Sequence, residues 1–322
     1  MTSQDAKTNF FDNLVIDIPK LYDENPIEKK ENPKKNYVPF TNNPFCRLYR
    51  NPFIPLKYRR YAYRALRQVN VDLTWFNQFK EYWGGILHGR PFWGVQDIYY
   101  LKNVYRSKFQ SLAIADSEDP LAHLKAWQQP ETIYSLLHFV IKESLTDHVY
   151  IVQHFNKLIR KKNKLKILEF GCSLAPIAAS LYTFGKFKPE HIYIADIQTL
   201  AFHYGAFRFR HSSNITPLVL TPENNFELQL DDHLDVIFCI EVFEHLNHPL
   251  ETIKTFYERL NTNGLLFFNY IKGDGGGLDT MQGVEQRKSV LNFVQQNFEI
   301  VFGNKPIEEN SGLIIARKKV SS

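Results

Sequence analysis

The segment from Lys166 to Pro176 constrains the fold most, because it joins a short apolar strand to a tight turn and a helix start. Ile167 and Leu168 fit a buried strand, and Gly171 permits a sharp bend after it. Pro176 suits the first turn of the helix that follows. In a parallel sheet such a turn lies at the carboxyl end of a strand, where ligands bind. The segment therefore predicts a ligand-binding turn, and a purely structural turn is the alternative.

The turn does not match the known phosphate-binding patterns. A dinucleotide fingerprint needs glycines at its first, third and sixth positions, which here are Gly171, Ser173 and Pro176. No Gly-Lys-Ser/Thr sequence follows, so a P-loop is excluded as well. We therefore expect a nucleotide-containing ligand without a pyrophosphate in preference to NAD.

Three further apolar runs predict more strands of the same sheet. They span residues 192–196, 234–240 and 264–271, with helical segments between them. The first of these runs ends in Asp196, a carboxylate that can accept hydrogen bonds from both hydroxyls of a ribose. The alternation of strand and helix predicts a doubly wound parallel sheet that binds its ligand at the carboxyl ends of the strands.

With these motifs in order, residues 164–318 resemble a class I S-adenosylmethionine-dependent methyltransferase. The first motif of that family, an acid before a glycine-rich turn, matches residues 169–175, where Ser173 and Ala175 replace the second and third glycines. The ribose acid of the family matches Asp196, and the motif of its fourth strand matches residues 235–245. Residues 298–302 and 312–317 resemble its closing antiparallel pair.

The resemblance implies an α/β fold, with a Rossmann-like doubly wound sheet of the methyltransferase type and a mainly helical N-terminal extension or cap. It also implies S-adenosylmethionine as the cofactor and methyl donor. Residues 221–225, which follow the third strand of the family and lie before the run at 234–240, are expected beside the adenine. The positions implied for cofactor binding are Glu169, Gly171, Cys172, Ser173, Ala175, Asp196, Ile197, Ile240 and Glu241.

His245 is the candidate catalytic base, because it follows the fourth strand near the expected position of the transferred methyl. The alternative is that His245 packs under the adjoining loop. Glu241, Glu244 and His245 are spaced i, i+3 and i+4, so they share one face if Glu241 opens a helix. We expect no metal, but these three residues are the candidate ligands for a divalent ion.

A glycine-rich loop at residues 272–279 follows the fifth strand. It could close over the acceptor, with Asp274 as a second candidate catalytic residue or Asp279 as a contact to substrate hydroxyls. The alternative is a flexible surface connection.

The chain is expected to divide into an N-terminal arm and substrate-selecting cap, residues 1–130, and a methyltransferase domain, residues 131–322. Seven of the sixteen prolines fall within the first 55 residues, which favours an extended arm. Residues 34–111 carry six Lys and eight Arg against three acidic residues, interleaved with aromatics. This segment could bind RNA, form a small-molecule pocket, or use its aromatics as the core of a helical cap. Two amphipathic helices are expected at 131–142 and 147–160.

The apolar runs, the N-terminal sequence and the cysteines indicate the compartment in which the protein is expected. No apolar run approaches the roughly 18 residues needed to cross a bilayer, and the N-terminus has no hydrophobic signal region. We therefore expect a cytoplasmic protein without membrane insertion. The three cysteines are widely spaced, so neither a disulfide framework nor a cysteine zinc site is expected, and Cys172 and Cys239 are predicted core residues.

The function expected from these features is O-methylation of a small-molecule acceptor, either a small polar metabolite or a sugar-containing precursor. N-methylation remains open. One alternative is an RNA-modifying methyltransferase that uses the basic segment 34–111 to bind nucleic acid, and another is a non-catalytic binding module on the same fold.

Overall fold

The computed structural model describes residues 48, 51, 53–68, 74–87, 94–114, 119, 121–142, 147–159, 164–273, 277–303 and 312–319. The expected N-terminal arm, Cys46 and the candidate catalytic residue Asp274 lie outside the described residues.

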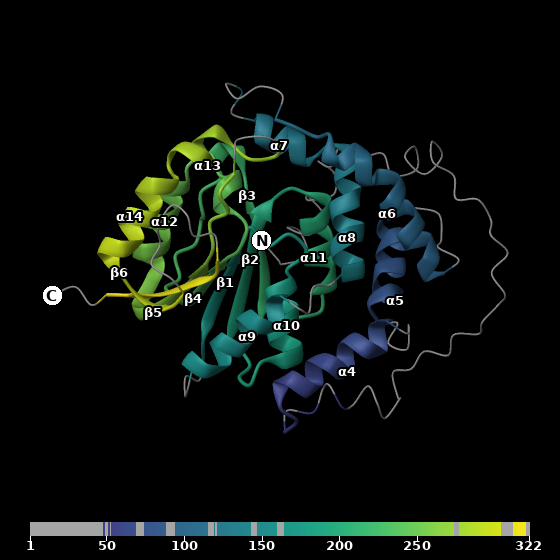
Figure 1. Ribbon diagram of the computed structural model, residues 1–322, viewed down its shortest axis with the longest axis horizontal. Helices are drawn as coiled ribbons and strands as arrows, with labels where there is room; N and C mark the ends of the chain where they lie inside the picture. The colour runs from purple at the N-terminus through teal and green to yellow at the C-terminus, as the bar shows by residue number, and fades with distance from the viewer. Residues whose placement is uncertain are drawn as a thin grey trace.

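The centre of the fold is a mixed sheet, which has seven strands within the described ranges. Their order is β3-β2-β1-β4-β5-β7-β6 (Figure 1). The first five strands of this order pair in parallel, whereas β7 is antiparallel to β5 and β6 is antiparallel to β7. The strands are β1 (Lys166–Phe170), β2 (His191–Ile197), β3 (Ile215–Leu220), β4 (Leu234–Cys239), β5 (Leu260–Phe268), β6 (Phe298–Phe302) and β7 (Ile314–Lys318). The predicted parallel sheet and its closing antiparallel pair are confirmed.

One strand boundary differs from the prediction. The strand expected to begin at Gly264 begins at Leu260, so residues 260–263 also lie within it. Asn263 has a positive φ of 63°, and the pairing of β4 with β5 shifts register between Leu234 and Val236. The positive φ of Asn263 and the register shift together indicate a bulge inside the strand.

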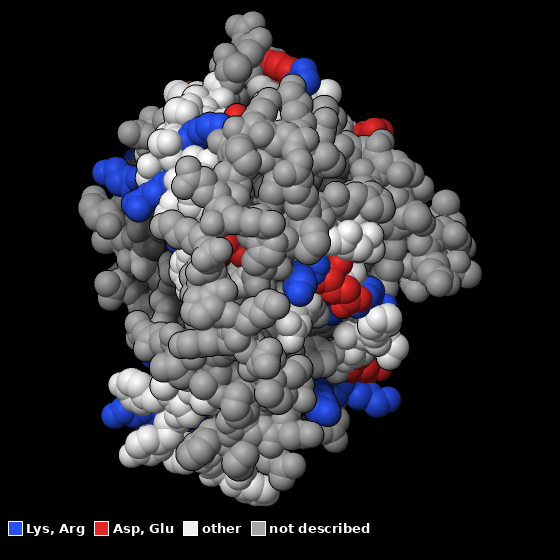
Figure 2. Space-filling view, turned by 90° about the vertical axis from the view of Figure 1, so that its right-hand side faces the viewer, with Lys and Arg blue, Asp and Glu red and all other residues white. Residues whose placement is uncertain are grey.

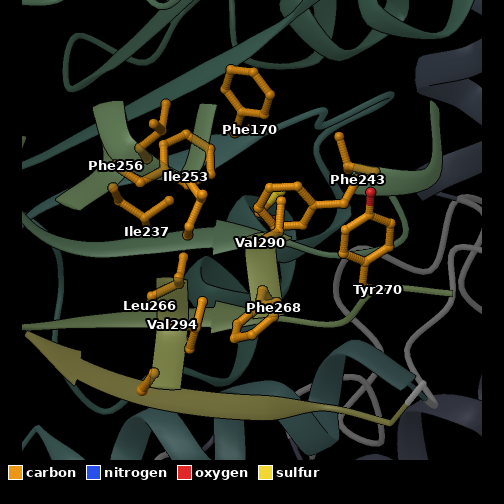
Figure 3. Close-up of a cluster of buried hydrophobic side chains, with 14 of the residues drawn as sticks. Phe170, Ile237, Phe243, Ile253, Phe256, Leu266, Phe268, Tyr270, Val290 and Val294 are labelled. Carbon is orange, nitrogen blue, oxygen red and sulfur yellow. The ribbon is translucent and has the colours of Figure 1, made fainter. Parts of the chain in front are cut away.

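The sheet is covered by helices on both faces, which is why its central strands are continuous apolar runs. Ile167 of β1 and Phe238 of β4 belong to one core cluster, together with residues of α9 (Asp147–Leu158) and α10 (Pro176–Phe184). The alternate residues, such as Leu168 and Ile237, pack against the other layer (Figure 3). That layer contains α12 (Pro249–Arg259) and α14 (Arg287–Asn297), with the short helix α13 (Met281–Glu285) beside it.

A second core joins the N-terminal helices to α11 (Leu200–Arg208). Aromatic residues dominate it: Phe79, Tyr82 and Trp83 are almost completely buried and pack near Tyr204. Figure 1 places α5, α6 and α8 on the same side of the molecule as α11. The N-terminal elements are α4 (Leu56–Gln68), α5 (Thr74–Glu81), the π-helix η2 (Tyr82–Ile86), α6 (Val95–Gln110), α7 (Ala122–Trp127), the 3₁₀ turn η3 (Pro130–Thr132) and α8 (Ile133–Lys142).

This core supports the simplest interpretation of the aromatic segment. The described aromatics of α5 and η2 form the interior of a helical cap, although Tyr58, Tyr61, Tyr99 and Tyr100 remain exposed. The two predicted amphipathic helices are confirmed as α8, preceded by η3, and α9. The division of the chain at residue 130 stays a prediction. None of the helices in the described part of the chain is long and apolar enough to span a membrane.

Candidate functional site

A cavity of about 640 Å³ opens at the carboxyl ends of β1, β2 and β4. Its size falls in the range of small-ligand sites. The turn after β1, the end of β2 and the segment that follows β4 line it, and α7 and α8 contribute side chains from the cap. This is the edge of the sheet at which the sequence predicted ligand binding.

The turn after β1 has an alternating backbone conformation. Gly171, Ser173 and Ala175 have positive φ angles of 62°, 50° and 55°. These are the three positions at which the resemblance expects glycine, so Ser173 and Ala175 adopt a left-handed conformation that a side chain disfavours by about 1–2 kcal/mol each. The backbone therefore bends as a glycine-rich turn would, with only one glycine retained.

Gly171 is also required by its surroundings. A Cβ atom at this position would lie 2.4 Å from Cγ2 and 2.6 Å from Cγ1 of Val242. Gly205 is a second such position, which the sequence reasoning missed: its Cβ would lie 2.9 Å from the carbonyl oxygen of Ser173. The absence of both side chains lets α11 and the segment after β4 pack directly against the turn.

Glu169 fastens the turn to the helix that follows. Its two carboxylate oxygens accept hydrogen bonds from the backbone N–H groups of Ile177, at 2.9 Å, and Ala178, at 2.7 Å. Burial raises the pKa of Glu169 to about 8, against the opposing effect of these two hydrogen bonds. Glu169 is only 3% exposed, and through these two hydrogen bonds its carboxyl group caps the N-terminus of α10. Its predicted contact with the cofactor stays a prediction.

Asp196 closes the same turn from the end of β2. One carboxylate oxygen accepts a hydrogen bond from the backbone N–H of Ser173 at 2.5 Å, and the other accepts one from Ile197 at 2.7 Å. Burial raises the pKa of Asp196 to about 6, although these hydrogen bonds and the charge of His245 favour the ionised form. The side chain lines the cavity, where its remaining lone pairs can accept hydrogen bonds from a ligand.

The segment after β4 does not form a helix that opens at Glu241, which was the condition for a face shared with Glu244 and His245. Glu241 has a positive φ of 57°, and its N–H donates a hydrogen bond to Oδ1 of Asn269 at 2.6 Å. The single helical turn is the 3₁₀ turn η5 (Phe243–His245). The shared face proposed for a metal was therefore wrong. Within the described ranges, no three His, Cys, Asp or Glu residues are arranged to hold a metal ion.

The η5 turn is held in place by the core beneath it. Phe243 is fully buried and stacks on Tyr270 at a centroid distance of 5.2 Å (Figure 3). The hydroxyl of Tyr270 in turn donates a hydrogen bond to the carbonyl oxygen of Gly283 in α13. This packing fixes the two residues that follow Phe243, which are Glu244 and His245.

His245 has one ring nitrogen bound and one available. Nδ1 lies 2.9 Å from the carbonyl oxygen of Leu278 and 3.2 Å from Oδ1 of Asp279. Both neighbours are acceptors, so Nδ1 carries the hydrogen and Nε2 of the neutral ring is the proton acceptor. The nearest oxygen of Glu244, Oε1, is 4.0 Å from Nε2, which is too far for a hydrogen bond.

The surroundings of His245 set its proton affinity. Burial alone would lower its pKa, but the hydrogen bond with Asp279, the negative charges of Glu244 and Asp279, and the bond to Leu278 raise the pKa above its ordinary value. Asp279, one of the two acids expected to touch the substrate, therefore contacts His245.

The comparisons with known proteins agree with this geometry. Residues 147–297 match a family model described as a methyltransferase domain. Residues 147–297 are therefore a methyltransferase domain. No curated protein sequence matches the chain.

Three solved structures match about half of the chain at low sequence identity. The N-methyltransferase NodS from Bradyrhizobium japonicum WM9, in complex with S-adenosyl-L-homocysteine, is 15% identical; the match covers 53% of this chain and 85% of NodS, with a TM-score of 0.39. TehB from Haemophilus influenzae is 18% identical over 53% of this chain and 62% of its own, with a TM-score of 0.37. SMU.1697c from Streptococcus mutans, also in complex with S-adenosylhomocysteine, is 16% identical over 54% of this chain and 98% of its own, with a TM-score of 0.38.

The residues of the cavity fit S-adenosylmethionine, the cofactor of the methyltransferase. This ligand has a positively charged sulfonium centre, and the described cavity lining includes seven acidic residues and no Lys or Arg. One of the seven, Glu169, is largely uncharged near neutral pH, because burial raises its pKa to about 8. Opposite charge at short range favours a bound cation. The seven are Glu169, Asp196, Glu227, Glu241, Glu244, Glu251 and Asp279.

The cavity brings together most of the positions implied for the cofactor. Eight of the nine line it, and the ninth, Ala175, is fully buried behind the turn and shapes its backbone. Asn225, from the segment expected beside the adenine, also lines the cavity. Cys172 and Cys239 are buried core residues, as predicted.

Among the cavity residues that sequence reasoning missed are His123 and Trp127 of α7. The ring of Trp127 lies 5.8 Å from that of His245 in an edge-to-face arrangement. His123 is buried, and burial together with the positive charge of His245 lowers its pKa to about 3. No local pattern marks this short helix as part of a site, because only the chain path brings it to the end of the sheet.

Proposed function

We propose that this methyltransferase transfers a methyl group to a hydroxyl oxygen of a small polar metabolite or sugar-containing precursor. The observation that carries the proposal is the pairing of His245 with Asp279 and Leu278, which directs the hydrogen of the neutral ring to Nδ1 and leaves Nε2 to accept a proton. An uncharged hydroxyl needs such a base, whereas S-adenosylmethionine itself supplies an already activated methyl group.

In the proposed reaction, the acceptor oxygen forms its new bond to the methyl carbon as the carbon–sulfur bond breaks. The electron pair of that bond remains on sulfur, and the hydroxyl proton passes to Nε2 of His245. Asp279 keeps the ring oriented and stabilises the imidazolium that forms, because its carboxylate lies 3.2 Å from Nδ1. A base positioned in this way contributes about 10²- to 10⁴-fold to the rate.

The fixed turn after β1 supports the binding half of the proposal. The bond from Ser173 to Asp196 and the bonds from Ile177 and Ala178 to Glu169 hold the backbone before any ligand arrives. Asp196 is the residue that we propose for the ribose hydroxyls. Alignment of two bound reactants can supply up to about 7–11 kcal/mol of the barrier reduction in favourable intramolecular models.

A small acceptor is favoured over RNA by the charges near the site. The acid-lined cavity would repel a phosphate backbone. Part of the basic segment is also used within the fold: Arg59 is 5% exposed and donates a hydrogen bond to the carbonyl oxygen of Thr183. Figure 2 shows described Lys and Arg residues in several places on this face, with described Asp and Glu residues beside some of them.

The test combines cofactor binding with turnover. Isothermal titration should show that the intact chain binds S-adenosylmethionine and that Asp196→Ala binds it much more weakly. The transfer of a tritiated methyl group into a cell extract should then fall by about 10²- to 10⁴-fold in His245→Gln, with cofactor affinity retained. His211→Gln, an exposed histidine on a surface turn, is the matched control and should behave as the wild type.

Two results would contradict the proposal. Absence of cofactor binding by the intact chain would remove its basis. Unchanged turnover in His245→Gln would exclude His245 as the base, and label recovered in RNA would favour the alternative acceptor.

A further inference from the structure

Two residues that line the cavity each carry a buried polar atom that has no hydrogen-bonding partner within the described part of the chain. The atoms are Nε2 of His123, a residue that is 9% exposed, and Oε2 of Glu244, a residue that is 4% exposed. Buried polar atoms are nearly always hydrogen-bonded, because a buried atom without a partner destabilises the protein. The two atoms therefore indicate a ligand that bonds to them.

The two residues belong to one continuous wall beside the proposed base. His123 and Trp127 lie on α7 with a ring distance of 6.5 Å, and Trp127 lies 5.8 Å from His245. His245 in turn lies next to Glu244, with 4.0 Å between Nε2 and Oε1. The end of α7 is anchored to the sheet, because Nε2 of Gln128 donates a hydrogen bond to the carbonyl oxygen of Gln198 at 2.9 Å.

We propose that His123 and Glu244 bind a hydroxyl group of the acceptor next to the hydroxyl that His245 deprotonates, so that the acceptor is an uncharged vicinal diol such as a sugar. This inference rests on the proposed function. A hydroxyl suits the two atoms because it donates one hydrogen bond and accepts others. It can donate its single hydrogen to Oε2 of Glu244 and accept a hydrogen bond from Nε2–H of a neutral His123. An ammonium group can only donate.

The wall also fits the rest of such a molecule. Trp127 offers an aromatic surface for the apolar face of a ring. The absence of Lys and Arg from the described lining of the cavity argues against a phosphate or carboxylate on the acceptor, since seven acidic side chains already surround it. The cap therefore selects the acceptor through α7, while the sheet binds the cofactor.

The test follows the label in a small-molecule extract of the organism that encodes the chain. The full-length protein and tritiated S-adenosylmethionine are incubated with extract fractions that are neutral, retained on an anion exchanger, or retained on a cation exchanger. We expect label in the neutral fraction, and we expect it to disappear when that fraction is first treated with periodate, which cleaves vicinal diols.

The outcomes separate the two proposals. Labelled product in the anionic or cationic fraction, or product formed equally well after periodate, would overturn the diol inference and leave methylation of a small molecule intact. Absence of label from every small-molecule fraction would overturn the proposed function itself.

Variants then assign the residues. In His123→Ala and Glu244→Gln, the amount of neutral fraction needed for half-maximal rate should rise roughly tenfold, which is the effect of losing one buried hydrogen bond. The affinity for S-adenosylhomocysteine, measured by titration, should not change, which also reports that each variant is folded. His211→Ala and Glu285→Gln are exposed controls. Unchanged half-saturation in both site variants would exclude the proposed contacts.

Discussion

The contact between Gly171 and Val242 makes the turn after β1 the most sharply testable part of the fold. In Gly171→Ala, the new Cβ would lie 2.4 Å and 2.6 Å from the two methyl carbons of Val242. Val242 is 6% exposed and β-branched, so it cannot easily rotate away. Overpacking of this kind costs about 1–3 kcal/mol, and the left-handed backbone at φ 62° adds about 1–2 kcal/mol. The free energy of unfolding should therefore fall by about 2–5 kcal/mol.

A double-mutant cycle separates the clash from the backbone strain. Val242→Ala removes both methyl carbons and should cost about 2 kcal/mol by itself. The nearest remaining atom to the new Cβ would then be Cβ of residue 242, at 3.1 Å. The double variant should therefore be about 1–3 kcal/mol more stable than the sum of the single effects.

Urea unfolding of the four proteins, followed by circular dichroism, measures the cycle. Gly84→Ala is the matched control: Gly84 lies in η2, nothing lies within 4 Å of the added Cβ, and the change should be neutral or stabilising by up to about 1 kcal/mol. Additivity of the two changes at the turn, or a loss below about 1 kcal/mol in Gly171→Ala, would refute the reasoning.

Three further predictions concern the charged and polar groups. In Asp279→Asn, the loss of the hydrogen bond and charge lowers the pKa of His245, so the acid limb of the rate profile should move to lower pH while turnover falls; an unmoved limb would exclude the pairing. Glu169→Gln should flatten the dependence of the free energy of unfolding on pH. Because the pKa of Glu169 is raised in the folded state, its protonation stabilises the protein below about pH 4.5, and this contribution is lost as pH rises through about 8. Urea unfolding across this pH window measures the contribution, and an unchanged slope would contradict the prediction. Tyr82→Phe removes the 2.7 Å hydrogen bond to Nδ1 of His203 and should destabilise the chain by about 1–3 kcal/mol, whereas Tyr58→Phe, at a 63% exposed position, should have no measurable effect on the same unfolding curve.

Much of the fold could be predicted because its signals are local. The central strands are buried on both faces, so each appears in the sequence as a short apolar run, and Pro176 marks the start of α10 as expected. The closing pair β6 and β7 was expected from the resemblance to a known family. The β5 boundary was misplaced, because a bulge keeps the residues around Asn263 within the strand.

The candidate site was only partly predictable, because its contacts are long-range. The sequence identified Glu169, Asp196 and His245, but not the partners of their side chains. The candidate metal face required a helix that opens at Glu241. The structure instead gives Glu241 a left-handed backbone held by Asn269, which removes that face.

By itself, the sequence determined the parallel sheet, the turn after β1 and the residues that follow β4. These features depend on residues close together in the chain, where spacing and composition are sufficient signals. The cofactor class was implied by the resemblance of these motifs to a known family. The tertiary structure alone decided that Asp279 pairs with His245, that Val242 packs over Gly171, and that α7 brings His123 and Trp127 to the cavity. Each of these contacts joins segments that the chain path separates, so packing determines them and local pattern does not.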